Sequence, residues 1–317
     1  MNFILNVSKS PDDSRDFIFT GSSSDMVSDT LPDVLDYTNE LLPIRDQGSQ
    51  GTCYAQSACC MKEWQESRDY GLKSYLSPQF FYNIRFNKYD DDENNDYGMY
   101  GRDVMKILSK IGICLEENYP YGQIEHRDQI SQQLYDEASQ HRIKHYARIE
   151  SMDDLKSSLF HNGPCLITVP VYNYGDYMWV PEGKEEHQGG HAMTVVGYNS
   201  DGFIIRNSWG NTWCNNGYCI FPYGHWGAQW EVWTTIDDLT ILNKPDIENQ
   251  HEYPDDYGER DIDIDNLDID VEPEPVEPKP VEPKPVEPKP VEPEHKLKER
   301  KETKKTNKKI LCPCTIM

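Results

Sequence analysis

Three residues in this sequence have the types and settings that nucleophilic catalysis requires, and the first is a cysteine. Cys53 follows the stretch Gln47–Thr52, whose small and polar residues are poor helix formers. After it, Tyr54, Ala58 and Met61 fall on one helical stripe. The pattern predicts a cysteine in the first turn of a helix, where unpaired N–H groups and the helix dipole favour the nucleophilic thiolate. A small buried cysteine is the alternative, and this stretch alone leaves both open.

A histidine and an asparagine supply the other two groups. His191 lies in Gly189–Met193 at the start of a predicted strand, and Asn207 ends the next one. Because Asn199–Gly202 has the residues of a hairpin turn, the two strands should pair and bring both side chains to the same end. The imidazole would then take the thiol proton, the asparagine oxygen would fix its tautomer, and Trp209 would shield that hydrogen bond. Taken singly, a structural histidine and a turn asparagine remain the alternatives.

Together, these residues resemble the papain/cathepsin family of cysteine peptidases over about residues 31 to 235. The order cysteine, histidine, asparagine matches, and His191 follows Cys53 by 138 residues, within the ~130–150 typical of this family. Gln47, six residues before Cys53, matches the family's oxyanion-hole glutamine. Further blocks match at Leu76–Gln79, Gly101, Asn118–Tyr121 and Gly217–Tyr218.

The resemblance implies a papain-like α+β fold, with a helical left subdomain, a β-rich right subdomain and the active-site cleft between them. It implies thiol-dependent hydrolysis of peptide bonds through Cys53, His191 and Asn207, with Gln47 and the Cys53 N–H as oxyanion donors. Substrate contacts are expected at Tyr100, Gly101, Gly190 and Trp209. We expect an endopeptidase that acts on proteins or peptides without a cofactor or metal. The alternatives are a catalytically silent papain-like binding module tethered by its tail, and a Cys-His-Asn amidase or transamidase.

The sequence departs from the family pattern at several positions. Gln50 replaces a usual cysteine, which removes a disulfide common in secreted members and suits a reducing compartment. Thr52 and Tyr54 replace more usual residues beside Cys53, and Cys214 stands where a glycine is usual. We expect no long inhibitory pro-domain, as in the short microbial branch of the family. We hypothesise that residues 1–30, predicted to be a loosely ordered extension, cover the cleft before activation.

Residues 31–243 are predicted to form the peptidase domain, whose first half is helical and whose second half is rich in strands. One helix should run from Cys53 to about Tyr70, with Gly71 past its end, and another should follow Gly101. A third should begin at Ser151, a capping residue. Strands are expected at residues 165–169, 192–198, 203–206 and 217–221.

The remainder of the chain has the composition of a tether. Residues 244–270 are acidic and are predicted to form a disordered linker, and residues 271–295 are a proline-rich repeat that favours an extended stalk. Residues 296–317 are basic and include a prenylation-like box at Cys314, with Cys312 as a second lipidation site. A solvated lysine tail and a nuclear localisation signal are the alternatives. We expect a cytoplasmic monomer anchored to the cytosolic face of an anionic membrane.

Composition limits the other function classes. The formal net charge of −24 argues against nucleic-acid binding by the peptidase body. The nine cysteines are odd in number and do not form a disulfide framework, and neither a secretory signal nor a membrane-spanning run is expected.

Overall fold

A computed structural model of the chain describes residues 3–14, 16–21, 30–85, 98–122 and 130–236. All of these lie in the first of the chain's two compact units, Met1–Asn249. The predicted linker, stalk and basic tail, with Cys312 and Cys314, lie outside the described residues. Within the described ranges, no helix combines the length and apolar character needed to cross a membrane.

The first half of the body is helical, as predicted. Helix α1 (Cys53–Tyr70) ends at Gly71, which adopts the left-handed conformation (φ 70°) that glycine tolerates best, so both predicted boundaries are confirmed. Its first fourteen residues are buried, and it forms the centre of this half. Around it lie α2 (Pro78–Asn83), α3 (Gly101–Lys110) and α4 (Gln132–Ala138), with a short 3-10 turn after α4.

The second half is an antiparallel sheet with the strand order β2-β7-β3-β4-β5-β6. Its strands are β2 (His145–Arg148), β3 (Cys165–Val171), β4 (Gly189–Tyr198), β5 (Gly202–Arg206), β6 (Tyr218–Pro222) and β7 (Glu231–Ile236), and the short β1 (Leu35–Asp36) pairs with β4. The four predicted strands correspond to β3 to β6. Helix α5 (Met152–Asn162) follows its N-cap residue Ser151. The Ser151 hydroxyl accepts the Asp154 N–H, as the capping pattern predicts.

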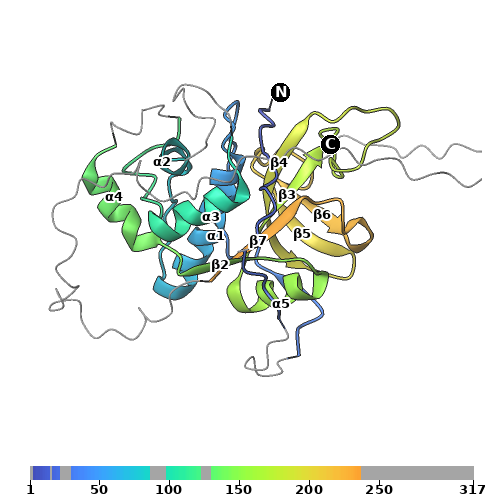
Figure 1. Cartoon of the computed structure of the whole chain (residues 1–317), viewed down its shortest axis with the longest axis horizontal. Helices are drawn as coiled ribbons and strands as arrows, with labels where there is room; N and C mark the ends of the chain where they lie inside the picture. Colours follow the sequence, from blue (N-terminus) through green and yellow to red (C-terminus); the bar gives the residue numbers. More distant parts are fainter. Residues whose placement is uncertain (1–2, 15, 22–29, 86–97, 123–129, 237–317) are drawn as a thin grey trace, which may run out of the picture. The chain divides into compact units, whose positions relative to one another are not determined.

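Each half has its own apolar core. One core gathers buried residues of α1, α2 and α3, and the other gathers buried residues of the sheet and α5. The halves meet where α1 packs against β4 and β3. Figure 1 shows α1 to α4 on one side and the sheet with α5 on the other. The predicted α+β architecture, a helical half beside a half rich in strands, is therefore confirmed.

The N-terminal segment, defined here as residues 3–14 and 16–21, passes between the helical half and the sheet (Figure 1, dark blue). The prediction of a loosely ordered extension is wrong for these residues. Val7 and Phe19 are buried, and Ser10 is 1% exposed. The apolar residues of the segment have no helical or strand period: Val7 joins the core of the helical half and Phe19 that of the sheet half, whereas Phe17 is 78% exposed. Periodicity therefore gave no sign of this packing.

Candidate active site

Cys53 is the first residue of α1 and is fully buried. The preceding residue, Thr52, caps the helix without donating or accepting a side-chain cap hydrogen bond, and no acidic residue lies in the first turn. The backbone N–H groups at this end therefore favour a negative charge at the sulfur. The predicted placement of Cys53 in the first turn of a helix is confirmed.

His191 and Asn207 come together on neighbouring strands. The antiparallel pairing of β4 with β5 places Thr194 opposite Arg206, so the strand start that carries His191 lies beside the residue after β5. His191 Nε2 lies 2.7 Å from Asn207 Oδ1, and the Ser208 N–H donates to the same oxygen at 2.7 Å. With Nε2–H donating to the asparagine, Nδ1 carries a lone pair, and this nitrogen has no hydrogen-bond partner among the described residues. The imidazole therefore holds the tautomer that can accept a proton at Nδ1.

Trp209 covers this hydrogen bond. Its ring stacks on His191 at 4.4 Å between centroids and is itself 1% exposed. Phe3 of the N-terminal segment stacks on the same indole, at 4.2 Å and an interplanar angle of 8°. Two aromatic rings thus keep water from the His191–Asn207 pair, which strengthens the hydrogen bond between them.

A sequence model described as papain family cysteine protease matches residues 31–231, well over half of the chain. The chain belongs to the papain family. The matched region begins after the N-terminal segment and contains Cys53, His191 and Asn207.

Several proteins of this family are similar in sequence or structure. An uncharacterized peptidase C1-like protein of Acanthamoeba polyphaga mimivirus is 29% identical over 199 residues, which are 56% of this chain and 63% of that protein. Mouse cathepsin K is 29% identical over 210 residues, 60% of this chain and 59% of its own length. The matched region therefore spans about three-fifths of the length of these relatives. The crystal structure of xylellain, a cysteine protease from Xylella fastidiosa, superposes with a TM-score of 0.65 at 27% identity, covering 74% of this chain and 96% of that one.

Gln47, the expected oxyanion donor, is held at both ends of its amide. Its Oε1 accepts the Ser208 hydroxyl at 2.6 Å, and its Nε2 donates to the Gln50 carbonyl at 2.9 Å. Its backbone N–H also donates to the Ser208 carbonyl at 2.8 Å. The amide nitrogen carries two N–H groups, and the contacts to described residues use one of them, so the other can donate to a further acceptor.

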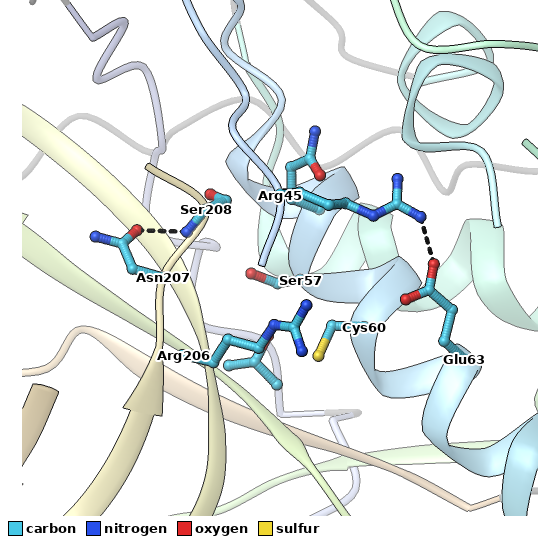
Figure 2. Close-up of a pocket in the computed structure, with 9 residues that line it drawn as sticks. Arg45, Ser57, Cys60, Glu63, Arg206, Asn207 and Ser208 are labelled. Atoms are coloured by element: carbon cyan, nitrogen blue, oxygen red, sulfur yellow. Dashed lines mark hydrogen bonds and ion pairs between the residues drawn. The ribbon is translucent and has the colours of Figure 1, made fainter. Parts of the chain in front are cut away.

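A small polar cavity lies where α1 meets the end of β5, behind Asn207 (Figure 2). Ser57, Cys60 and Glu63 of α1 line one side, and Arg206 and Asn207 line the other. Arg45 spans the helical side by pairing with Glu63 and, at 2.8 Å, with Glu116. The charge of Arg206, at the end of β5, acts on Glu63 and Cys60 of α1, so charged and polar groups of the helix and the strand face each other across this cavity.

The residues expected to bind substrate contact the N-terminal segment. Asn6 pairs with Gly190, and the Val7 N–H donates to the Gly190 carbonyl at 3.4 Å. Ser8 pairs in the same way with Tyr100, which caps α3. Gly190 allows this close approach, because a methyl group there would lie 2.5 Å from the Val7 carbonyl oxygen. The segment therefore occupies both backbone edges of the cleft.

Burial also sets the protonation of the site. Burial lowers the pKa of His191 to about 4, and the hydrogen bond to Asn207 acts in the opposite direction. At neutral pH the covered imidazole is therefore uncharged.

Two residues that hold the segment did not stand out in the sequence. Arg102 donates from Nε and Nη2 to the Asp16 carboxylate, both at 2.8 Å, and Glu231 accepts from Ser10. Arg102 lies in the first turn of α3 and Glu231 is the first residue of β7, and only packing between residues distant in sequence brings them to the segment. The structure also gives a reason why a glycine is usual at the position of Cys214. Its backbone is left-handed (φ 42°), a conformation that suits the glycine usual there.

Proposed function

We propose that this chain is a cysteine endopeptidase that cleaves protein substrates through an acyl-enzyme. The Cys53 thiol gives its proton to His191 Nδ1, and the sulfur attacks the peptide carbonyl carbon. The imidazolium then donates that proton to the leaving amine, which departs as the C–N bond breaks. Water attacks the thioester with His191 as base, and the acid product leaves as Cys53 recovers its proton.

The oxyanion formed at each stage requires donors. The remaining Nε2–H of Gln47 and the Cys53 backbone N–H are assigned this role, each worth about 3 kcal/mol in transition-state stabilisation. Asn207 would hold the imidazole in place and stabilise its charged form, since the Nε2–H bond to Oδ1 raises the pKa of His191.

The observation that carries this proposal is the His191–Asn207 hydrogen bond beneath Trp209, on the strand that packs against α1. A binding module that had lost activity would have no need to keep a histidine in the proton-accepting tautomer and shielded from water. The same geometry also serves an amidase or transamidase, so the substrate has to be tested directly.

The decisive experiment combines labelling and product analysis. A peptidyl probe with a thiol-reactive group should label Cys53, and incubation with unfolded proteins should give internal cleavage products. A silent module would neither be labelled nor cleave, even in a chain that begins near Leu31 and lacks the N-terminal segment. An exopeptidase would release only terminal residues, and a transamidase would join peptides to added amines rather than to water.

We further propose that the N-terminal segment holds the enzyme inactive. It covers Trp209 with Phe3, lies on Gly190 and Tyr100, and leaves Cys53 and His191 with no exposed surface. An uncharged imidazole in a covered site also disfavours the thiolate–imidazolium pair that attacks substrate. A chain that begins near Leu31 should therefore be more active than the full chain, and equal activity would count against the segment as an inhibitor.

Finally, we propose from the sequence that the basic tail anchors the enzyme to a membrane in the cytoplasm. Support comes from the coincidence of the Cys314 box, the basic run before it and a second cysteine, Cys312. One lipid chain binds only marginally, and the basic run would supply about 1 kcal/mol per residue near an anionic leaflet. A Cys314→Ser chain should lose membrane association in eukaryotic cells. Undiminished association would refute the anchor.

A further inference from the structure

A tight hairpin, called here the β6 hairpin, leads into strand β6. Residues 216–217 form its turn, and both have left-handed backbones (φ 53° and 88°), as a type I′ turn requires. Asn215 and Tyr218 flank the turn and exchange two backbone hydrogen bonds, at 3.1 and 3.0 Å. One step further out along the two arms, the sequence has Cys214 and Cys219.

The pairing of the hairpin brings these two cysteines opposite each other. The positions next to a hydrogen-bonded antiparallel pair have Cα atoms about 4.5 Å apart. A disulfide spans Cα separations of about 4.4–6.8 Å. The backbones at Cys214 and Cys219, both of which are free thiols, are therefore close enough to be joined by a disulfide.

The two thiols share one charged neighbour. Burial and a hydrogen bond to the Asp176 carboxylate raise the pKa of Cys214 to about 11. Burial, Cys214 and then Asp176 raise the pKa of Cys219. Because electrostatic effects weaken with distance, both sulfurs lie near the same carboxylate and near each other.

The two thiols differ in exposure. The Cys214 side chain is exposed, so an external oxidant can reach it, whereas Cys219 is 6% exposed. The Cys214 backbone is left-handed (φ 42°), a conformation that disfavours residues with a side chain. Packing does not offset this strain, since the side chain lies at the surface. The second thiol opposite it supplies a reason for a cysteine here.

We propose that Cys214 and Cys219 are a modification site, at which oxidation forms a reversible disulfide that closes the β6 hairpin. The oxidant is a low-molecular-weight disulfide such as glutathione disulfide. The Cys214 thiolate attacks one of its sulfurs, and the first small thiol leaves with the proton that Cys214 lost. The Cys219 sulfur then attacks the Cys214 sulfur, and the second small thiol leaves with the proton of Cys219. The protein sulfurs lose two electrons, which the oxidant gains.

The β6 hairpin supports the candidate active site. The Gly217 carbonyl accepts the Asn207 N–H at 2.9 Å, and the Gly217 N–H donates to the Trp213 carbonyl at 2.8 Å. Trp213 packs edge-on against Trp209 at 5.8 Å between centroids, and its indole N–H donates to the Tyr174 carbonyl at 3.0 Å. A disulfide across the hairpin would restrict its opening and hold Asn207 and Trp209 in place.

The test uses the full chain in glutathione buffers with an increasing share of the disulfide form. Free thiols are then alkylated, and the peptide that contains Cys214 and Cys219 is analysed by mass spectrometry. This peptide should become two hydrogens lighter and take up no alkyl group, and dithiothreitol should reverse the change. In the oxidised chain, the N–H groups of Asn207 and Gly217 should exchange with solvent at least about tenfold more slowly.

Two sets of variants serve as controls. Cys214→Ser and Cys219→Ser should each abolish the disulfide within this peptide. Replacing the tail thiols together, with Cys312→Ser and Cys314→Ser, should leave it intact. The assignment is overturned if both thiols of the unmodified chain are still alkylated at the highest share of glutathione disulfide, or if Cys214 pairs only with glutathione or with another cysteine. Equal exchange rates in the oxidised and reduced chains would refute the closing of the hairpin.

Discussion

The helical half and the sheet half, called here the helical wall and the sheet wall of the expected cleft, place the proposed reactive groups in different ways. On the helical wall, Cys53 owes its position to a helix boundary: the residues before it do not continue the helix, and those after it do. On the sheet wall, His191 and Asn207 are 16 residues apart in sequence and meet only because β4 and β5 pair in one register. The proposed nucleophile is placed by local structure, and the proposed base by the assembly of the sheet.

This difference explains what can control the site. Neither wall alone has all of the proposed reacting groups. A segment that contacts both walls can therefore control whether these groups reach a substrate. The N-terminal segment does so, with Phe3 on Trp209 of the sheet wall and Ser8 beside Tyr100 of the helical wall. Substitutions in one wall, in the contact between the walls and in the segment that covers them should each have a different effect on activity.

The largest effect should come from the helical wall. Cys53→Ala removes the nucleophile, and cleavage of an unfolded protein should fall by a factor on the order of 10⁴–10⁶. The change deletes one atom at a buried site, so the fold should remain and the melting temperature should shift by only a few degrees. Residual cleavage at the original rate would rule out Cys53 as the nucleophile. Cys59→Ala is the matched control, because Cys59 is equally buried on the same helix.

The next effect tests the link between the walls. Gln47→Ala removes an amide that is anchored to Ser208 of the sheet wall, and it should lower kcat by about 10²–10³-fold with little change in KM. Gln65→Ala is the control. Gln65 is a buried glutamine of α1 that donates to Thr235, away from the site, so its loss should reduce stability and leave kcat unchanged. A change in KM alone would mean that Gln47 only binds substrate.

In both halves the sequence predicted the elements that local patterns mark, such as the Ser151 cap, the end of α1 at Gly71 and the helix at Gly101, and it missed the short helices α2 and α4. Strands β2 and β7 were not predicted, because their sequences lack a clear alternation of apolar and polar residues. The packing of the N-terminal segment and the role of Arg102 depend on contacts distant in sequence, and no local pattern encodes such contacts.

His191 of the sheet wall should affect how the free energy of unfolding depends on pH. Burial holds the pKa of His191 near 4 in the folded chain, below its unfolded value of about 6.5, so the unfolded state binds the proton first as pH falls. His191 therefore contributes about 3 kcal/mol to the free energy of unfolding above pH 6.5, and this contribution is lost as the pH falls towards 4. Burial raises the pKa of Asp103 to about 6, so the folded chain binds this proton before the unfolded chain does. Uptake of the proton by Asp103 therefore stabilises the folded chain as the pH falls through much of the same range.

Because these two groups oppose each other, the His191 contribution must be measured by difference. Urea unfolding of the unmodified chain and of His191→Gln should be compared at pH 7 and pH 4. The free energy of unfolding should fall more steeply with acid in the unmodified chain. Parallel slopes for the two proteins would mean that His191 is not held neutral by burial.

The smallest effect should come from the segment that joins the walls. Asp16 is 6% exposed at its side chain, and both of its oxygens accept from Arg102 of the helical wall. Asp16→Asn removes the charge from this pair, which should weaken docking of the segment by about tenfold and shorten the delay before the full chain begins to cleave a peptide. Asp12→Asn is the control, because the Asp12 side chain is 85% exposed and lies 3.9 Å from Arg148. If both variants behave like the unmodified chain, the charged end of the segment does not hold it in place, and the aromatic contact of Phe3 with Trp209 becomes the dominant anchor.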